Sequence, residues 1–328
     1  PRTFSSAASD VYKRQTEWTA VGGSHKIKVI VDEEEQITES DEDNNEETED
    51  IAVSYPPILL LDDDNSGNNG GSRTETDSYY ANALDNLTNP IAYDIVRVNS
   101  SADAPGIDVL SEYQMIIWVC GTDYQSGDTD VTFTDNDKSN VAEYLEDGGA
   151  MWVVGMDILY DFDTSDGDRS AGDFEHDYLG VSYADNDRAT PAVVYGVDDD
   201  PISDGIEYDA DAISSDFADD INPRTGFEKV LSSNGDYNIS TIRTEDEFKL
   251  VFMTIDFSSI TSSDDRDEFM ENVVEYLVEQ LENDVSLSRF NTPKDEETVE
   301  PNVENIVNVT VRNRGTAVSY THLRAHET

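Results

Sequence analysis

The stretch Met115 to Asp123 (MIIWVCGTD) is an apolar run that ends abruptly at a glycine and an acid. A short apolar run bounded by turn residues is typical of a strand buried on both faces, and such strands belong to parallel sheets covered by helices. Two other stretches have the same form, Pro57 to Asp64 (PILLLDDD) and Gly149 to Asp157 (GAMWVVGMD), and segments of helical period separate the three. The sequence therefore predicts an α/β domain with a doubly wound, mostly parallel sheet, whose ligands bind outside the carboxyl ends of the strands.

The chain of 328 residues is strongly acidic, because 73 Asp and Glu outnumber 20 Lys and Arg and leave a net charge of −53. Its length predicts about two domains. Nucleic acids and anionic membranes both bind proteins through cationic side chains, so we expect no nucleic acid partner and no membrane contact. Acid in this excess solvates a protein in concentrated salt or binds divalent cations.

The two ends differ from the rest of the chain. Two terminal stretches lack a periodic apolar pattern and carry little acid: Ser5 to Gln15 (SSAASDVYKRQ) and Ser319 to Thr328 (SYTHLRAHET). Together they hold two of the four histidines. They resemble translated sequencing-adapter sequence, so residues 1–15 and 318–328 are excluded from the prediction of the fold. Ordinary terminal segments are the alternative. If the two ends are adapter sequence, we expect the natural protein to continue beyond both of them.

Residues 16–55 contain a strand-like alternation from His25 to Val31, an acidic run to Asp50, and a short strand from Ile51 to Val53. The pattern from Val31 to Asn45 (VDxxxxIxESxExNN) resembles the closing hairpin of CARDB domains, cell-surface β-sandwiches of immunoglobulin-like form. The resemblance implies that residues 16–55 are the C-terminal part of such a sandwich. Without it, the acidic run predicts a solvated loop between two strands.

Paired prolines at Pro56 and Pro57 mark the start of the α/β domain, which is predicted to extend over residues 56–283. Its predicted elements are helices near Glu75–Leu87, from Thr134 to about Leu145 and from Asp264 to Asn283, and strands at 58–61, 93–98, 115–120, 151–154, 193–197 and 250–255. A capping box at Thr134 and Asp137 is expected to start the second helix. The segment from Asp157 to about Asp187 is predicted to be rich in loops.

Four motifs carry a second resemblance: GTDY after the strand at 115–120, TDxDxxxVxxYLxxGG from Thr134 to Gly149, GxD at Gly155–Asp157, and the Phe257 to Arg266 pattern. They are similar to the class I glutamine amidotransferase-like superfamily, in the non-catalytic version found in secreted multidomain proteins. This implies a flavodoxin-like, amidotransferase-like sheet. Residues 284–317 resemble the first strands of a second CARDB sandwich, so incomplete β-sandwich fragments are expected to flank the α/β domain.

An amidotransferase needs a cysteine nucleophile in a tight turn after the fourth strand, activated by a histidine. The chain has Gly155-Met156-Asp157 at that turn, so no catalytic residue is assigned. The only cysteine, Cys120, excludes a disulfide framework and a thiolate zinc site. Its place at the end of an apolar run predicts a buried, inert thiol, with a nucleophile paired to His176 as the alternative. His176 is itself expected at the surface or at a helix end.

In a flavodoxin-like order the first, third and fourth strands are neighbours, and their carboxyl ends meet at one crevice. Carboxylates gathered there repel one another unless they are protonated or bind a hard divalent cation through oxygen ligands. The sequence therefore predicts a Ca²⁺ or Mg²⁺ site formed by Asp62, Asp64, Asp123 and Asp157. The alternative is a water-filled acidic mouth whose carboxylates pair in part with Arg73 or Arg169.

These observations predict a non-catalytic binding, adhesion or spacer segment of a large acidic protein that is secreted or attached to the cell surface. Its partners would be an unknown surface ligand or neighbouring domains of the same chain. The first alternative is a hydrolase that uses the acidic crevice and a metal-activated water. The second, a salt-adapted cytoplasmic protein, rests on the low lysine content, and the sandwich resemblances argue against it.

Overall fold

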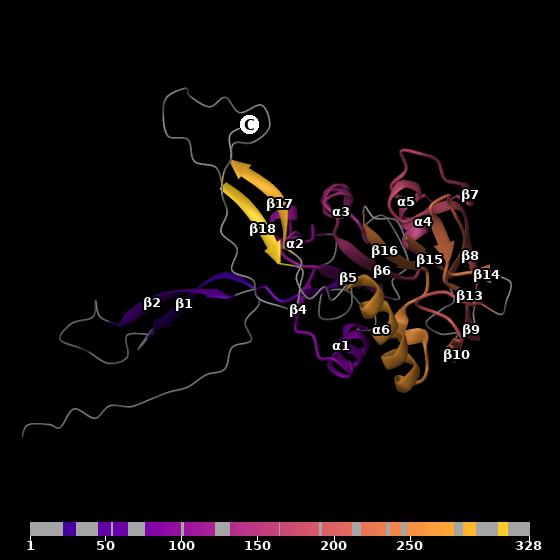
Figure 1. Ribbon diagram of the computed structural model, residues 1–328, viewed down its shortest axis with the longest axis horizontal. Coiled ribbons are helices and arrows are strands. Elements are labelled where there is room, and N and C mark those ends of the chain that lie inside the picture. The colour runs from indigo at the N-terminus through magenta and orange to yellow at the C-terminus, as the bar shows by residue number, and fades with distance from the viewer. Residues whose placement is uncertain are drawn as a thin grey trace, which may run out of the picture. The chain divides into compact units, whose positions relative to one another are not determined.

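The computed structural model describes most of the α/β region and parts of both flanks (Figure 1). The described residues are 22–30, 45–53, 55–64, 76–99, 102–121, 132–163, 165–189, 192–211, 218–233, 237–243, 248–278, 285–292 and 308–313. The chain divides into two compact units, Pro1–Tyr55 and Pro56–Thr328. No helix among the described residues is both long enough and apolar enough to cross a membrane.

The first unit contains an antiparallel hairpin of β1 (Gly23–Ile30) and β2 (Glu46–Val53). The prediction that the acidic run forms a loop as far as Asp50 is wrong, because β2 already begins at Glu46. Antiparallel pairing continues from Gly23 and Val53 to Ile30 and Glu46, so the acidic residues of this stretch belong to a strand. Two exposed ion pairs accompany the pairing, with Lys26 Nζ 2.8 Å from Asp50 Oδ1 and Lys28 Nζ 2.6 Å from Glu46 Oε2. Opposite charges on facing strands stabilise a pairing that the acidic composition alone would disfavour.

The second unit is built on a seven-stranded sheet of order β12-β15-β16-β6-β5-β3-β4. Five strands are parallel: β3 (Ile58–Asp62), β4 (Tyr93–Arg97), β5 (Met115–Gly121), β6 (Ala150–Gly155) and β16 (Lys249–Met253). Two antiparallel strands, β15 (Ser240–Arg243) and β12 (Phe227–Lys229), extend one edge. All residues of β3, β5 and β6 are buried and these strands are neighbours, so the predicted α/β class and the central position of Met115–Cys120 are confirmed.

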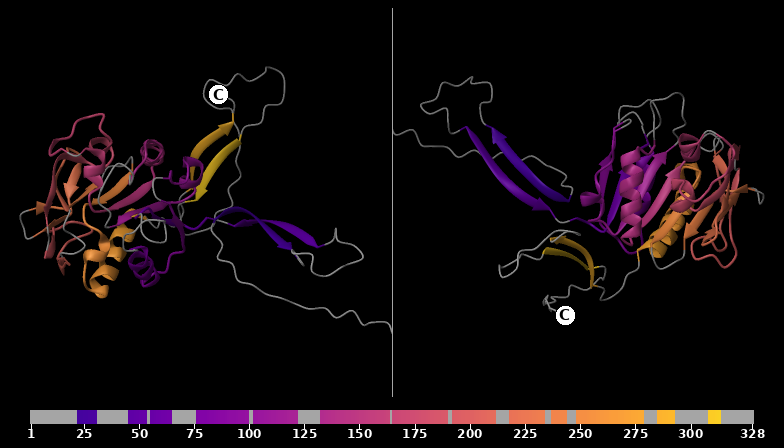
Figure 2. Two further views of the ribbon diagram at one scale, coloured as in Figure 1. Left: turned by 180° about the vertical axis from the view of Figure 1, so that it is seen from behind. Right: turned by 90° about the horizontal axis from the view of Figure 1, so that it is seen from above.

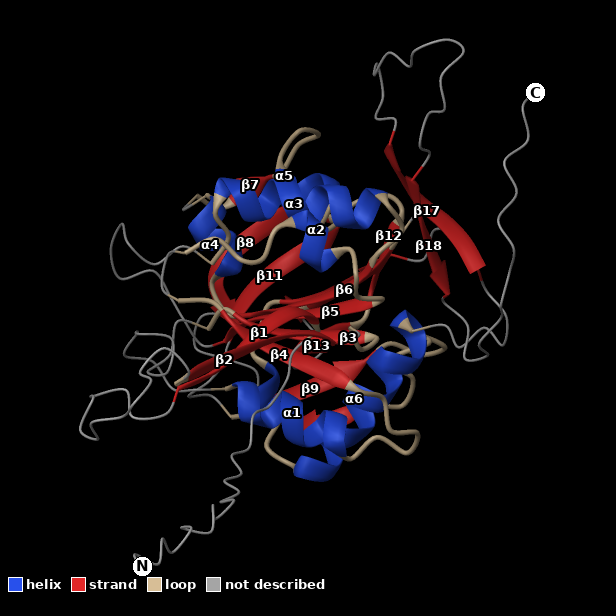
Figure 3. Cartoon of the chain, turned by 90° about the vertical axis from the view of Figure 1, so that its left-hand side faces the viewer, coloured by secondary structure: helices blue, strands red, loops and turns tan. Residues whose placement is uncertain are grey.

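Helices cover both faces of this sheet. Figure 3 shows α1 (Asp77–Asp85) and α6 (Ser263–Leu277) on one side and α2 (Ile107–Leu110) and α3 (Asp135–Glu146) on the other. The predicted capping box starts α3, since Thr134 Oγ1 accepts a hydrogen bond from Asp137 N at 3.1 Å and Asp137 Oδ2 accepts one from Thr134 N at 2.9 Å. Local sequence chemistry thus fixes where this helix begins.

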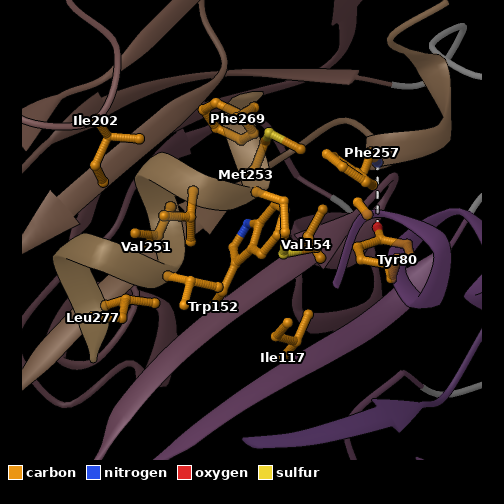
Figure 4. Close-up of a cluster of buried hydrophobic side chains, with 14 of the residues drawn as sticks. Tyr80, Ile117, Trp152, Val154, Ile202, Val251, Met253, Phe257, Phe269 and Leu277 are labelled. Carbon is orange, nitrogen blue, oxygen red and sulfur yellow. Dashed lines mark hydrogen bonds between the residues drawn. The ribbon is translucent and has the colours of Figure 1, made fainter. Parts of the chain in front are cut away.

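The main core lies between the sheet and the α1 and α6 layer (Figure 4). Trp152 of β6 is fully buried there, and its ring centroid lies 5.8 Å from Tyr80, 5.4 Å from Phe257 and 5.7 Å from Phe269. Phe257 begins the short 3₁₀ helix η3 (Phe257–Ser259). These rings join three helical segments to the sheet.

The segment after β6 is more regular than predicted. In place of a loop-rich stretch, residues 157–189 contain α4 (Ile158–Phe162), β7 (Gly167–Asp168), α5 (Phe174–Asp177) and β8 (Val181–Ala189). Isolated apolar residues anchor these elements, since Ile158, Leu159, Leu179 and Val181 are each fully buried. Single anchors separated by acidic residues produce no periodic pattern, which is why the sequence did not reveal them.

Two small sheets complete this unit. One has the order β11-β8-β7 and the other β10-β9-β13-β14, built from β9 (Val193–Gly196), β10 (Glu207–Asp209), β11 (Ala218–Pro223), β13 (Leu231–Ser233) and β14 (Tyr237–Asn238). Figures 1 and 2 show these later strands gathered at one side of the α/β sheet. Near the end of the chain, β17 (Val285–Thr292) and β18 (Asn308–Asn313) form an antiparallel pair, where two strands were expected.

Candidate binding crevice

Buried carboxyl groups follow the carboxyl ends of three parallel strands. Asp62, Asp63 and Asp64 end β3, Asp157 follows β6, and Asp256 follows β16. None of these five side chains belongs to a residue more than 7% exposed. Because burial disfavours an ionised carboxylate, each one needs a proton, a hydrogen-bond donor or a cation.

Asp62 and Asp64 lie together at the end of β3. Asp64 N donates to Asp62 Oδ1 at 3.4 Å, and Asp64 Oδ2 accepts from both Thr76 N at 2.9 Å and Thr76 Oγ1 at 3.2 Å. Burial, and then the negative charge of Asp64, raise the pKa of Asp62 to about 8. Burial is therefore the main reason that Asp62 ionises less readily than an exposed aspartate.

Arg97, the last residue of β4, places a cation beside this pair. Its Nε lies 3.3 Å from Asp62 Oδ2, and its Nη2 is also hydrogen-bonded to Asp77. The Arg97 side chain is 44% exposed, so water screens its charge, and it is shared between two acids. We therefore conclude that Arg97 offsets only part of the effect of burial on Asp62.

Asp63 has a different environment, as expected for the next residue of an extended chain. Trp118 Nε1 donates a hydrogen bond to Asp63 Oδ2 at 3.0 Å. Burial raises the pKa of Asp63 well above its usual value, although the bond from Trp118 acts in the opposite direction. Asp63 is thus held by a side chain of the neighbouring strand β5.

Two glycines allow the strand ends to pack closely. Gly121 has φ of +68°, and a Cβ there would lie 2.5 Å from Asp64 Cβ. A Cβ on Gly155 would lie 2.7 Å from Cys120 Cβ. Cys120 is fully buried beneath this contact, which confirms the prediction of a buried thiol.

The turn after β6 places Asp157 in a left-handed conformation, with φ of 60° and ψ of 11°, immediately before α4. Asp and Asn tolerate this region better than most other residues. The backbone therefore gives a structural reason for an acid at position 157, independent of any ligand. Met156, beside it, is 2% exposed.

Sequence reasoning missed Asp256 and Tyr80. Tyr80 Oη donates to Asp256 Oδ2 at 2.9 Å and accepts from Phe257 N at 3.2 Å. Burial raises the pKa values of both side chains. Asp256 directly follows the predicted apolar strand at 250–255, so the signal that identified Asp62 and Asp157 could also have identified Asp256.

The predicted metal ligands are only partly brought together. Asp62 and Asp64 are adjacent, Asp157 lies beyond β6, which β5 separates from β3, and Asp123 lies outside the described residues. Within the described ranges, no group of three or more His, Cys, Asp or Glu side chains is arranged to hold a metal ion. The four-ligand site therefore stays a prediction.

Among the described residues, the arginine beside Asp62 is Arg97, which the sequence did not suggest. Arg169 is 6% exposed, and its Nε lies 3.2 Å from Glu175 Oε1. Arg73 lies outside the described residues. His176, on α5, has Nδ1 2.7 Å from Asp177 Oδ1.

Comparison with protein families gives one match, in which the CARDB family model matches residues 6–49. The matched region is less than half of the chain, contains β1 and the first residues of β2, and begins within the segment 1–15. No curated protein matches the chain significantly.

Solved structures show only distant similarity. A β-galactosidase from Bacillus circulans sp. alkalophilus is 14% identical with a TM-score of 0.44, covering 68% of this chain and 30% of that one. A β-galactosidase from the Antarctic haloarchaeon Halorubrum lacusprofundi is 13% identical with a TM-score of 0.43, covering 80% and 40%. A ThuA-like protein from Bacteroides uniformis is 13% identical with a TM-score of 0.43, covering 67% and 90%. The chain thus matches less than half the length of these β-galactosidases, and no functional argument is drawn from similarity at this level.

Proposed function

We propose that the chain is a non-catalytic binding or spacer segment of a large, acidic protein that is secreted or attached to the cell surface. In this proposal an α/β domain with flavodoxin-like strand order, similar to glutamine amidotransferase-like domains, lies between immunoglobulin-like modules. The CARDB match at residues 6–49 supports a surface location, because CARDB domains belong to extracellular and surface proteins.

The observation that carries the proposal is the turn after β6. An acyl-transfer enzyme of the amidotransferase type needs a thiolate there. The turn holds Gly155, Met156 and Asp157 instead. Cys120 is fully buried in β5, where it can reach neither solvent nor a substrate.

Thiol labelling tests this directly, because the chain has one cysteine. We expect an aromatic disulfide reagent to label Cys120 only after denaturation, and we expect no release of ammonia from glutamine by the native chain. Rapid stoichiometric labelling of the native chain together with glutaminase activity would contradict the proposal. The variant Cys120→Ser distinguishes that activity from a contaminant.

A divalent cation in the crevice is part of the proposal. Asp62 and Asp64 supply carboxylate oxygens, which Ca²⁺ and Mg²⁺ prefer, and Asp123 and Asp157 would complete the ligand set. Arg97 beside Asp62 competes with such an ion for the same charge. A bound cation would supply positive charge that offsets the repulsion among these buried carboxylates. The four aspartates would hold the cation through their carboxylate oxygens.

Isothermal titration of the full chain with Ca²⁺, after treatment with a chelator, tests the cation. We expect saturable heat that is lost in Asp64→Asn and retained in Asp108→Asn, where the exposed Asp108 lies on α2. Heat that is equal in both variants would place the ion elsewhere on this acidic surface. An absence of heat at millimolar Ca²⁺ would exclude the site.

One observation favours the hydrolase as a second candidate. A carboxyl group with a pKa of about 8 exchanges protons near neutral pH, as a general acid or base must. In this reading Asp62 would transfer a proton to or from a metal-activated water. Metal-dependent turnover of an ester, peptide or glycoside that is lost in Asp62→Asn and kept in Asp108→Asn would favour the enzyme over the binding segment.

A further inference from the structure

Four short stretches of the chain match the acceptor motif for N-linked glycosylation, Asn-x-Ser/Thr, in which x is not proline. They begin at Asn86, Asn99, Asn238 and Asn308. Such a short motif also arises by chance, so the motif alone does not show which asparagine can be modified. An acceptor must lie on the surface, because a glycan is bulky and strongly hydrated. Asn86 and Asn238 are the two for which the structure describes all three side chains of the motif.

The Asn86 motif lies on the surface, between α1 and β4. Asn86 is the C-cap of α1, and β4 begins at Tyr93. Asn86 and Thr88 are exposed, whereas Leu87 between them is 6% exposed and belongs to the hydrophobic core. Leu87 therefore anchors the connection, and the two residues that define the motif remain in contact with solvent. Surface connections of this kind tolerate additions better than the elements that they join.

The hydrogen bonds of this connection are compatible with a modified amide. Asn86 Nδ2 donates to Asp267 Oδ2 on α6 at 2.9 Å. A primary amide nitrogen carries two hydrogens, and glycosylation replaces only one of them, so the other can still donate to Asp267. Thr88 donates through its backbone N to Glu271 Oε2 at 2.8 Å, a bond that does not involve the Thr88 side chain.

Asn238 provides a contrast within the same chain. It is 2% exposed, and its Nδ2 donates to the Ile221 carbonyl at 2.8 Å. Ser240, the third residue of that motif, is fully buried, and its Oγ donates to the Phe252 carbonyl at 2.7 Å. Because protein interiors are closely packed, a glycan on Asn238 has no room in the folded chain.

We propose that Asn86 is a site of N-linked glycosylation and that Asn238 is not. The inference rests on the proposed surface location, because this modification is typical of exported proteins. The donor is a sugar joined through C1 to a phosphate or diphosphate carrier. Asn86 Nδ2 forms a bond to C1 as the bond from C1 to the phosphate oxygen breaks. One amide proton is released, and the carrier leaves as its phosphate.

Glucosylation of the folded full chain in solution tests the site. The probe is UDP-glucose with a soluble N-glycosyltransferase that recognises Asn-x-Ser/Thr. We expect mass spectrometry to find one glucose on Asn86 and none on Asn238. In peptides released by trypsin, both motifs should accept glucose, because folding then no longer protects Asn238. Absence of glucose from Asn86 of the folded chain, or equal modification of Asn86 and Asn238, would overturn the proposal.

Two variants at Thr88 distinguish recognition of the motif from an effect on the fold. Thr88→Ala destroys the motif but keeps Asn86 and the backbone bond to Glu271, so modification of Asn86 should be lost. Thr88→Ser keeps the motif and should retain the modification. Asn82→Gln is the control, because Asn82 is an exposed asparagine of α1 outside any motif, and this variant should still be modified at Asn86. Circular dichroism verifies that each variant is folded.

Expression of the full chain behind a secretion signal, in a eukaryotic host that glycosylates exported proteins, separates this proposal from the proposed surface location. We expect the exported chain to carry a glycan on Asn86 that is absent from Thr88→Ala. An exported, folded chain without a glycan on Asn86 would overturn the proposal. Retention of the signal-bearing chain inside the cell would contradict the surface location instead, and glucosylation in solution would then decide whether Asn86 is an acceptor.

Discussion

The β1–β2 hairpin and the central sheet both contain aliphatic residues in their strands, yet they bury these side chains to very different degrees. Every residue of β3, β5 and β6 is buried. In the hairpin, Val29 is 57% exposed and Ile51 is 37% exposed. Because stabilisation by apolar side chains scales with the area removed from water, similar residues contribute far more in the sheet than in the hairpin. A two-stranded hairpin is marginally stable by itself.

The largest expected effect comes from the centre of the sheet. Trp152→Ala should lower the free energy of unfolding by about 3–5 kcal/mol, because a large cavity would remain among Tyr80, Phe257 and Phe269. Denaturant unfolding followed by circular dichroism measures the change. Trp152→Phe is the control and should cost less, since it keeps most of the ring volume and removes an indole N–H that has no partner among the described residues. A loss below about 1 kcal/mol for the alanine variant would show that burial at this position has little energetic weight.

The central sheet could be predicted from sequence because its strands are uninterrupted apolar runs that end in glycine or acid. The start of α3 could be predicted because a capping box is a local pattern. Both signals involve residues close together in the chain. For the same reason the adjacent acids Asp62 and Asp64 could be placed at the end of the β3 run.

Other features depend on contacts between distant segments. The hydrogen bond from Tyr80 to Asp256 joins residues separated by 176 positions, so no local sequence pattern predicts it. The sequence placed Tyr80 only within the predicted helix near Glu75–Leu87. The left-handed conformation of Asp157 is likewise set by the connection between β6 and α4. An acidic composition indicates solvated carboxylates, and the burial of Asp62 follows only from the packing of the strand ends.

The second prediction concerns a buried polar contact at the carboxyl edge of the same sheet. Tyr80→Phe should cost about 1–3 kcal/mol, because it removes the donor to the buried Asp256 and the acceptor for Phe257 N. Tyr79→Phe is a matched control on the same helix, and Tyr79 is 38% exposed, so its effect should be close to zero. Denaturant unfolding measures both free energies. Equal losses in the two variants would show that the buried hydrogen bonds of Tyr80 contribute no more to stability than the exposed hydroxyl of Tyr79.

The third prediction concerns pH. The pKa of Asp62 is raised from its ordinary 3.8 to about 8, so the folded chain keeps a proton that the unfolded chain releases between these values. The stabilisation by this group is fully present below about pH 4 and is lost as pH rises through 8. The slope of the unfolding free energy against pH is at most about 1.4 kcal/mol per pH unit for one group.

Between pH 6 and pH 8 the exposed carboxylates are already ionised. The buried Asp63 and Asp256 also have raised pKa values, so comparison with a variant at position 62 is needed to separate the effect of Asp62. Asp62→Asn does not titrate and should have a smaller negative slope than the unsubstituted chain, whereas Asp108→Asn should keep the original slope. A slope unchanged in Asp62→Asn would mean that Asp62 is ionised in the folded chain and that Arg97 neutralises it.

The smallest expected effect lies in the hairpin and completes the comparison. Lys26 and Asp50 form an ion pair of 2.8 Å, but their side chains are 66% and 80% exposed. Exposed pairs contribute about 0–1 kcal/mol, so Lys26→Ala should change the hydrogen-exchange protection of β1 amides only slightly, and the change should disappear in concentrated salt. Lys28→Ala, which removes the pair with Glu46, should behave in the same way. A large loss of protection in either variant would show that charge pairing, and not apolar burial, holds β1 and β2 together. The two β regions would then differ in the kind of interaction that stabilises them and not only in its amount.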